Sequence, residues 1–467
     1  MASSNSTPLS TLLQIITDGV KAIEVACEKR GVRYPTLDDP LTAESVALQD
    51  SLSEIALPVV AASYQLTATL MNPYGYYTTH TFAAEESVAA SVAEMAHVAE
   101  ILRDAGPQGL HVKDIAAYST VDAGKLAHCL RFLSSFHIFK EISPDRFANT
   151  RISTILDTGK PVKEILADPV AKYDNTRGFA AVTAAVADDF LKGAAYVREA
   201  FSDPVTAASD APDDGPLQLA IGRKDPLFVW WEAPENEWRL RRFGNAMIAM
   251  QWSAPMEGGF DWASLPKGSV VVDVGGGFGG VVTELAKTHK HLKYICQDRP
   301  QVTEQGMKMW KEQGNEDVLN GTVTLQGHDF FSEQPVKDAS VFVLKYIMHN
   351  WGDAWCVKIL KQLRAAATPK TQLLIIDALI GYNCPSDGRW SHVPGGEGPT
   401  APEGLLPNFG IGTSDVQYLG ILLMHATNTR ERTLDEMNKL FELSGWKIER
   451  VHRFPPPGMP QIVGVPV

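Results

Sequence analysis

A run of glycines is the strongest chemical signal in this chain. Five of the six residues from Gly275 to Gly280 are glycine, and they follow the apolar run VVVDV. Glycine lets a turn take positive φ and lets the backbone approach a ligand closely. Read as GxGxxG through Gly275, Gly277 and Gly280, the run predicts a cofactor site at a turn between a strand and a helix. A turn kept only for tight packing is the weaker explanation of so many glycines.

Asp298 is the second part of the same predicted site. It ends the next apolar run, LKYICQD, 23 residues after Gly275. A carboxylate at the end of the second strand can accept hydrogen bonds from both hydroxyl groups of a ribose. A glycine turn and a ribose-binding acid suit a nicotinamide dinucleotide and S-adenosylmethionine equally well, so both cofactors remain open at this point.

Later segments carry further side chains capable of chemistry. An acid and an aromatic residue follow the third predicted strand, and a lysine and a histidine follow the fourth. One further acid follows the fifth strand, and another precedes the last helix. Because parallel strands end at one edge of their sheet, we expect the first three groups to gather there. The candidates are Asp329, Phe330, Lys345, His349, Trp351, Asp377 and Glu431.

The elements that must position these side chains begin at residue 262. Short β-branched runs alternate there with amphipathic helices, which predicts an α/β fold with a mostly parallel sheet and helices on both faces. A Pro- and Gly-rich loop, residues 381–412, borders the active site or is an insertion. Thr433 and Glu436 form a capping box at the start of the last helix, and Gly445 ends it. The segments WKIERVHRF and QIVGVPV predict a closing antiparallel pair.

The first part of the chain reads as helical. Residues 9–30 and 43–72 have helical periodicity, which indicates a lid or a subunit interface. Residues 87–152 are typical of a winged-helix unit, and residues 177–252 are again helical. We therefore predict a helical, winged-helix-like dimerisation domain over 1–175 and a catalytic domain over 176–467.

Charge argues against nucleic acid as the partner of the winged-helix unit. The formal net charge of the 467-residue chain is −13. Residues 87–151 contain seven Lys or Arg and seven Asp or Glu. A helix that reads DNA needs a cationic face to neutralise phosphates, so a winged-helix regulator is disfavoured.

The cysteines and the N-terminus indicate the compartment. The five cysteines are dispersed without a CxxC pair, which is typical of reduced thiols and not of a disulfide framework or a zinc site. We expect no metal site. The apolar stretch near the N-terminus is interrupted by Asp18 and Lys21, and no segment approaches ~20 uninterrupted apolar residues. We expect a cytoplasmic protein without a membrane span.

Taken in order, these motifs resemble the plant- and fungal-type small-molecule O-methyltransferases, the family that includes caffeate O-methyltransferase. The resemblance covers most of the chain, to the segment Arg430-Glu-Arg-Thr433, and is greatest for the fungal members. It implies a Rossmann-like class I methyltransferase domain with a mostly parallel seven-stranded sheet behind a dimerisation domain. It also implies S-adenosylmethionine as the cofactor, a small aromatic substrate and a homodimer.

The resemblance assigns the cofactor contacts residue by residue. Gly275 would lie against the methionine part of the cofactor, with Gly277 in the same turn, and Asp298 would hold the ribose. The residues that would frame the adenine or contact the cofactor from the fourth strand are Asp329, Phe330, Lys345 and Trp351. Plainer alternatives are a surface lysine at 345 and a core phenylalanine at 330.

His349 matches the family's catalytic base. A phenolic hydroxyl has a pKa of about 10, so a base that titrates near neutrality suits its deprotonation. Asp377 is expected to hydrogen-bond the other ring nitrogen, and Glu431 resembles the family's second acid. The alternatives are a structural histidine and a surface glutamate.

The chain departs from the family pattern at three places. Asn350 replaces an aspartate, Asp377 replaces a glutamate, and the segment LGILLMHATN is aliphatic where relatives carry an Asp and a Met beside the substrate. These departures bear on the shape of the substrate more than on the reaction. Adaptable Met and aromatic side chains either line the acceptor pocket or belong to the core, and the candidates are Met247, Met250, Trp230, Trp231 and Phe243.

Competing functions remain at this stage. A protein of the same fold that keeps the cofactor without transferring methyl, such as a pericyclase, is the main alternative to an enzyme that methylates a hydroxyl. A nicotinamide oxidoreductase is more distant, because it offers no role for Lys345 or Asp329.

Overall fold

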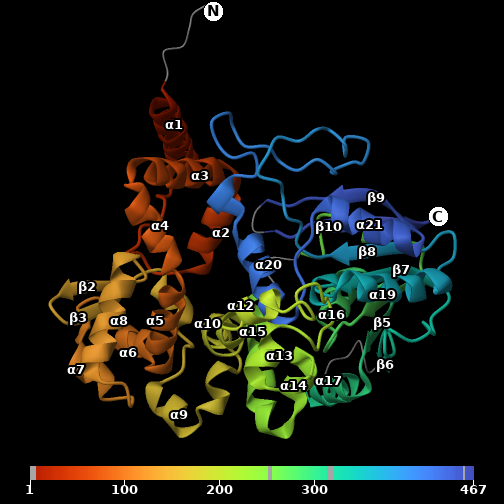
Figure 1. Cartoon of the computed structure of the whole chain (residues 1–467), viewed down its shortest axis with the longest axis horizontal. Helices are drawn as coiled ribbons and strands as arrows, with labels where there is room; N and C mark the ends of the chain where they lie inside the picture. The colour runs from red at the N-terminus through yellow and green to blue at the C-terminus, as the bar shows by residue number, and fades with distance from the viewer. Residues whose placement is uncertain (1–6, 251–254, 313–319, 456–457) are drawn as a thin grey trace, which may run out of the picture. The chain divides into compact units, whose positions relative to one another are not determined.

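The computed structural model describes residues 7–250, 255–312, 320–455 and 458–467, without the side chains of Met250 and Glu312. The chain divides into two compact units (Figure 1). The first contains Met1–Ala195, Leu227–Gln251 and Pro402–Leu405, and the second contains Tyr196–Pro226, Trp252–Ala401 and Leu406–Val467. Each unit is defined by contacts within it and combines segments that are separate in the sequence. The predicted domain boundary at residues 175–176 stays a prediction.

The second unit is built on a seven-stranded sheet with the order β6-β5-β4-β7-β8-β10-β9, so β6 and β9 form its two edges (Figure 1). Its strands are β4 (Val270–Val274), β5 (Lys293–Asp298), β6 (Val323–Gly327), β7 (Ala339–Lys345), β8 (Gln372–Ile376), β9 (Trp446–His452) and β10 (Gln461–Pro466). The five strands from β4 to β8 pair in parallel, and β10 pairs antiparallel with both β8 and β9. The predicted mostly parallel sheet and the closing antiparallel pair are confirmed.

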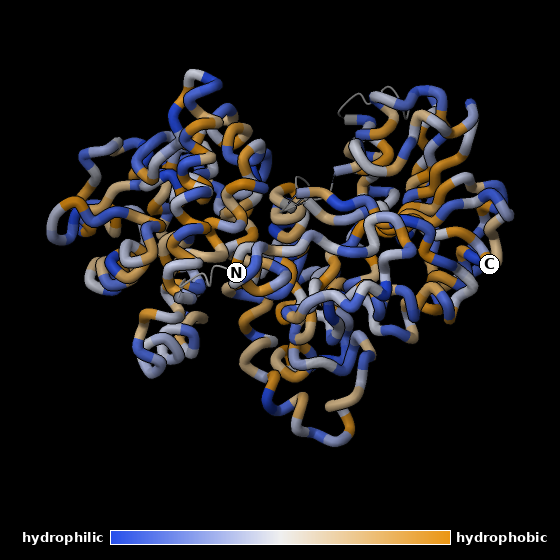
Figure 2. The backbone as a smooth tube through the Cα atoms, turned by 90° about the horizontal axis from the view of Figure 1, so that it is seen from above, coloured by the Kyte–Doolittle hydropathy of each residue, from blue (hydrophilic) through white to orange (hydrophobic). Residues whose placement is uncertain are grey.

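Helices cover the two faces of this sheet and create two cores. The helices of the second unit are α12 (Val197–Ser202), α13 (Pro216–Ile221), α16 (Gly280–Thr288), α17 (Pro300–Glu312), α19 (Asp353–Ala366), α20 (Asp415–Ala426) and α21 (Leu434–Ser444). Side chains of α19 and α21 pack in one core, and those of α16 and α17 pack in the other. Strands covered on both faces must be apolar, which explains the buried run Leu373–Ile376 of β8. Figure 2 shows such apolar stretches in orange along the backbone.

The strand order reverses at β4, which lies between β5 and β7. Chains that leave the carboxyl ends of β4 and β7 therefore diverge to opposite faces, and the space between them is where open α/β sheets bind ligands. The predicted capping box of α21 is confirmed, since the Thr433 hydroxyl accepts from the Glu436 amide and the Glu436 carboxylate accepts from the Thr433 amide.

The first unit is mainly helical. Its helices are α1 (Pro8–Lys29), α2 (Ala43–Ser51), α3 (Ser53–Leu70), α4 (Pro73–Thr81), α5 (Ala84–Met95), α6 (Val98–Ala105), α7 (Val112–Ala116), α8 (Ala123–Ser135), α9 (Val162–Ala167), α10 (Phe179–Ala185), α11 (Leu191–Ala194), α14 (Leu227–Glu232) and α15 (Glu237–Met250). A small antiparallel sheet of order β1-β3-β2 accompanies them, with β1 (Leu110–His111), β2 (Phe139–Ser143) and β3 (Arg146–Asn149). The predicted helix over 43–72 is interrupted at Leu52, which ends α2 and precedes α3.

Aromatic residues of α14 and α15 form part of the interior of the first unit. Trp231 is fully buried, and its ring lies 4.4 Å from that of Phe243 and 6.1 Å from that of Phe190. The Trp231 indole donates to Asp189, a buried aspartate that also pairs with Arg242. None of the described helices is long and apolar enough to cross a membrane.

Candidate active site

The glycine turn joins the end of β4 to the start of α16. Gly275 and Gly277 have φ of +76° and +58°, a region that L side chains rarely adopt. A Cβ on Gly275 would lie 2.5 Å from the Ile347 side chain and 3.5 Å from Phe330, so the turn packs against both. A Cβ on Gly277 would have no atom within 4 Å, which means that this part of the turn borders open space.

Asp298 lies at the end of β5, beside the glycine turn. Its Oδ2 accepts the backbone N–H of Gly277 at 2.8 Å, and its Oδ1 accepts that of Arg299 at 2.8 Å. Each oxygen of an ionised carboxylate can accept more than one hydrogen bond, so the group has capacity for ligand hydroxyls. The two backbone amides orient the carboxylate next to Gly277.

Asp273 is a buried acid at this turn that is not among the residues predicted from the sequence motifs. Its Oδ2 has no hydrogen-bond partner among the described residues, and a Cβ on Gly276 would lie 2.3 Å from that oxygen. Burial raises the pKa of Asp273 to about 7, although the positive charge of Lys345 acts in the opposite direction. The signal for it was an acid inside the otherwise apolar run VVVDV, immediately before the glycines.

Lys345 ends β7 and is half-buried. Burial lowers its pKa, while the negative charges of Glu284 and Asp273 act to raise it. Its Nζ lies 5.8 Å from the centre of the Tyr346 ring. Because β4 and β7 pair in parallel with Asp273 opposite Val343, Lys345 lies at the sheet edge from which the glycine turn leaves β4.

Phe330 and Trp351 lie together. Their rings meet edge to face at 5.7 Å, and Phe331 lies 4.8 Å from Trp351 in the same manner. Asp329 is exposed, and its Oδ1 accepts the Phe331 amide at 3.0 Å. These residues form an aromatic wall with an acid at its edge, next to the glycine turn that Phe330 contacts.

The turn after β7 carries His349. It begins with Tyr346, whose φ of +58° is unusual for a non-glycine residue, and continues as a short 3₁₀ segment, Met348–Asn350. The side-chain amide of Asn350 donates, through Nδ2, to the Tyr346 carbonyl oxygen at 2.9 Å. Asn350, which replaces the family's aspartate, therefore closes the turn that presents His349.

His349 and Glu431 form a buried pair. Their Nδ1 and Oε1 atoms lie 2.7 Å apart, and His349 is 8% exposed. Glu431 engages Nδ1, so Nε2 is the ring nitrogen that remains for a second partner. Burial lowers the pKa of His349, but the negative charges of Glu431 and Asp377 outweigh it and raise the pKa to about 9.

Asp377 is placed differently from the expectation. Its Oδ2 accepts the Met348 amide at 3.0 Å, and its Oδ1 has no partner in the described part of the chain. The hydrogen bond to His349 that we expected from Asp377 is made by Glu431. The aspartate is one methylene shorter than the family's glutamate, so its carboxylate stops at the backbone of the turn. Burial raises the pKa of Asp377 to about 7, and the positive charge of His349 opposes this rise.

Two residues near Glu431, which the sequence motifs did not predict, also hold the turn. The Thr429 hydroxyl donates to the carbonyl oxygen of His349. Arg432 is 1% exposed and donates to the carbonyl oxygens of Met348 at 2.8 Å and Trp351 at 2.7 Å. In the sequence, only their position close to Glu431 marks these two residues. A charged loop residue such as Arg432 normally faces solvent, so its burial could not be predicted.

Comparison with known proteins identifies the family. The sequence model of the O-methyltransferase domain matches residues 216–389. The chain is 38% identical over 452 residues to 4-O-methyltransferase 1 of Phanerochaete chrysosporium, and the match covers 96% of each protein. The chain belongs to the O-methyltransferase family.

Solved structures show the same fold at lower identity. A complex of LepI with S-adenosylmethionine matches with a TM-score of 0.65 and 15% identity, covering 91% of this chain and 100% of that one. A protein described as a pericyclic reaction enzyme matches with a TM-score of 0.66 at 15% identity and the same coverage. The second unit thus carries the class I methyltransferase fold. As a member of the O-methyltransferase family, the protein uses S-adenosylmethionine.

The residues at the glycine turn fit this cofactor chemically. The open side of Gly277 leaves room at the turn, and the oriented carboxylate of Asp298 suits a ribose diol. The unpartnered oxygen of Asp273 suits a cationic group such as the ammonium of the methionine moiety, since a buried carboxylate without a donor is costly.

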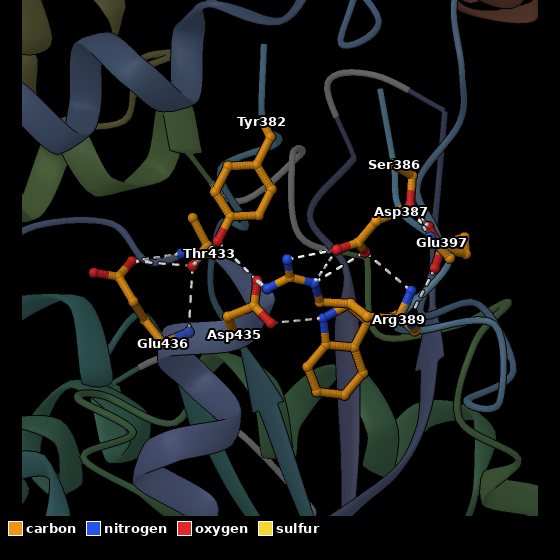
Figure 3. Close-up of polar contacts among 10 residues, drawn as sticks. Tyr382, Ser386, Asp387, Arg389, Glu397, Thr433, Asp435 and Glu436 are labelled. Atoms are coloured by element: carbon orange, nitrogen blue, oxygen red, sulfur yellow. Dashed lines mark hydrogen bonds and ion pairs between the residues drawn. The ribbon is translucent and has the colours of Figure 1, made fainter. Parts of the chain in front are cut away.

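The start of α21 also anchors the loop that follows β8. Asp435 accepts from the Tyr382 hydroxyl at 2.7 Å, from the Trp390 indole at 3.1 Å and from Arg389 at 3.4 Å (Figure 3). The predicted loop over 381–412 is thereby tied to α21, which begins at Leu434, two residues after Arg432.

We expect Asp435→Ala to loosen this loop. Three donors lose their acceptor, but the site is partly exposed, so the loss of local stability is about 1 kcal/mol. Proteolytic cleavage within residues 381–397 should accelerate about fivefold, which corresponds to that energy. Cleavage rates measured by mass spectrometry test this. Glu442→Gln, on the same helix, should cleave at the native rate, and equal rates for both variants would contradict the anchoring role.

The two methionines predicted to line the acceptor pocket belong to α15 of the first unit. Met247 is half-buried there, and the side chain of Met250 lies outside the described residues. The glycine turn and His349 belong to the second unit. The role of Met247 and Met250 in substrate binding stays a prediction.

Proposed function

We propose that this enzyme methylates a phenolic hydroxyl group of a small, largely apolar aromatic molecule, with His349 as the general base. One observation carries the proposal: His349 pairs with buried Glu431 through Nδ1, which leaves Nε2 as the ring nitrogen for the acceptor. The turn that bears His349 also contains Ile347, which packs on Gly275 of the proposed cofactor site.

Bound S-adenosylmethionine supplies an electrophilic methyl group on a sulfonium. The protein's task is to hold the acceptor oxygen in line and to remove its proton. Nε2 of His349 takes the proton, while Glu431 accepts the hydrogen bond of Nδ1–H and stabilises the imidazolium that forms. Asp377 fixes the turn through the Met348 amide and adds a second negative charge near the imidazole.

The proposed cofactor contacts follow the family assignment. The glycine turn approaches the cofactor, Asp298 binds its ribose, Lys345 contacts it from the end of β7, and the acid and aromatic side chains enclose the adenine. The residues are Gly275, Gly277, Asp298, Asp329, Phe330, Lys345 and Trp351. The open space at Gly277 and the contact between Phe330 and Gly275 support this arrangement.

The substrate class rests on chemistry and on one relative. The relative from Phanerochaete chrysosporium is named a 4-O-methyltransferase, which supports a hydroxyl oxygen as the acceptor. A panel of hydroxylated aromatics incubated with methyl-labelled S-adenosylmethionine tests the proposal. A product heavier by one methyl group supports it, and the absence of labelled product across the panel counts against it.

A non-methylating cyclase is the second candidate, because the fold also matches a pericyclic reaction enzyme. It predicts a product with the mass of its substrate and no accumulation of demethylated cofactor. The name and the higher identity of the fungal relative favour methylation.

We also propose a homodimer formed by the first unit. Helices α1 and α3 pack together, yet large apolar side chains remain exposed on them, including Leu13 at 58%, Val60 at 51% and Leu70 at 65%. Such apolar surface is typical of subunit interfaces. Light scattering after size-exclusion chromatography measures the oligomeric state, and a monomer would refute this part of the proposal.

Glu431→Gln should move the pH profile of the enzyme. Methylation needs the neutral imidazole, so kcat/KM rises with pH through the pKa of His349, which lies at about 9. Removing the negative charge of Glu431 destabilises the imidazolium and lowers that pKa. The rising limb should therefore shift to lower pH by about one unit or more, with a lower plateau.

The matched control is Glu436→Gln, which removes a carboxylate from the first turn of α21 that pairs with Arg430. Its pH profile should coincide with that of the native enzyme. A profile of Glu431→Gln that also coincides with the native one would separate Glu431 from the base.

A further inference from the structure

Arg432 lies at the junction of the three segments that bring the proposed catalytic groups together. Its guanidinium donates to the carbonyl oxygens of Met348 and Trp351, which flank the His349–Asn350 step of the turn. Its backbone forms a parallel bridge with Leu379, just after Asp377, and its carbonyl oxygen accepts the Ile380 amide at 2.9 Å. Glu431 precedes it in the chain.

The Arg432 side chain is itself held in place. Oδ1 of Asp353, at the start of α19, accepts from its Nε at 3.0 Å and from its Nη2 at 2.8 Å. A planar guanidinium with several donors in fixed directions can bind two carbonyl oxygens and a carboxylate at the same time, which an ammonium group cannot match.

We propose that Arg432 is a positioning residue for the base, which locks the turn between Met348 and Trp351 so that the His349 imidazole stays on Glu431 with its other nitrogen toward the acceptor. The proposal rests on the proposed role of His349 in methyl transfer. Thr429 and Cys356 assist, since the hydroxyl donates to the His349 carbonyl oxygen and the thiol approaches the same two carbonyl oxygens as Arg432.

Arg432 also acts on the charge of the base. The imidazole contacts the carboxylate of Glu431, the ring of Tyr346 lies 5.7 Å from it, and the charges of Glu431, Asp377 and Arg432 act on it. Glu431 and Asp377 raise the pKa of His349, and the positive charge of Arg432 lowers it. Position and charge can therefore be separated by substitution.

The experiment compares Arg432→Lys with Arg432→Gln in the full-length enzyme. Lysine keeps the charge but loses the fork of donors, so kcat should fall by about 10- to 100-fold with KM and cofactor affinity nearly unchanged, as expected for a misplaced catalytic group. Glutamine also removes the charge, so the titration of His349 should move to higher pH. The titration is followed by NMR with labelled histidine and assigned with His349→Gln.

Arg430→Gln is the matched control. Arg430 lies two residues away, is 44% exposed, and pairs with Glu436 and Asp353 without a described bond to the turn. It should retain the native kcat and His349 titration. A folded Arg432→Lys enzyme with native kcat, or an Arg432→Gln enzyme with native titration, would overturn the proposal, because a purely structural arginine alters only the melting temperature.

Asp353→Asn gives a second test if the arginine variants do not fold. The Asp353 side chain is 41% exposed, so the change is milder, and it weakens the bond that orients Arg432. We expect kcat to fall by about 3- to 10-fold. A native kcat would count against the proposal.

The NMR signal of the His349 Nδ1 proton, which is hydrogen-bonded to Glu431, distinguishes failure of the proposed base role of His349 from failure of the proposed positioning role of Arg432. If His349 is not the base, His349→Ala retains turnover, yet loss of Arg432 still broadens or shifts that proton signal. If Arg432 does not position His349, the signal stays native while His349→Ala remains inactive.

Discussion

His349→Ala should lower kcat by about 100-fold or more while leaving the affinity for S-adenosylmethionine within about twofold of the native value. The reason is that the imidazole accepts a proton from the acceptor hydroxyl but is not among the groups proposed to hold the cofactor. Single-turnover methylation and calorimetry measure the two quantities separately. Added imidazole should restore part of the rate, since the substitution leaves a cavity beside Glu431.

This variant also leaves a carboxylate buried without its partner, so its stability has to be measured. Loss of one member of a buried ionic pair commonly costs about 3–5 kcal/mol. His349→Gln is the control, because its amide can still donate to Glu431 while it cannot accept a proton. Both variants should be inactive, and normal turnover in either folded variant would remove His349 from the mechanism.

Asp298→Ala should weaken cofactor binding with a smaller direct effect on the methyl-transfer step. A hydrogen bond to a charged group contributes about 1.5–3 kcal/mol, so loss of the ribose contacts should raise the Kd about 10- to 100-fold. The substitution also removes the acceptor that orients the Gly277 amide at 2.8 Å. Calorimetric titration with S-adenosylmethionine measures the change.

Asp298→Asn serves as the graded control. Asparagine keeps one oxygen acceptor for the Gly277 amide but loses the charge, so its Kd should lie between those of the native enzyme and Asp298→Ala. At saturating cofactor both variants should recover most of their kcat. An unchanged Kd in Asp298→Ala would show that the ribose does not bind there.

The local features of the second unit could be predicted from the sequence because they depend on residues that are close together in the chain. The glycine run has to be a turn, since so many glycines cannot sustain a strand or a helix. The capping box of α21 and the alternation of strands and helices follow from patterns within a few residues, and the structure contains them. The limit appears in the first unit, where Leu52 divides a region of continuous helical periodicity.

In the candidate site, too, the sequence predicted local features but not the contacts between distant segments. Periodicity and strand ends brought Asp298, His349 and Asp377 to one edge of the sheet. They did not show which acid binds the imidazole. Glu431 lies 82 residues after His349 in the chain, and its contact at 2.7 Å depends on the backbone bridge between Leu379 and Arg432.

By itself, the sequence determined the kind of fold, the cofactor turn and the residue types available for acid–base chemistry, because each of these is encoded in short patterns of polarity and spacing. Only the tertiary structure decided that Glu431 holds His349, that Asp377 binds the backbone of the turn, and that Arg432 is buried among carbonyl oxygens. Those contacts depend on side-chain length and on the register of segments far apart in the chain, and differences of a single methylene redirect them.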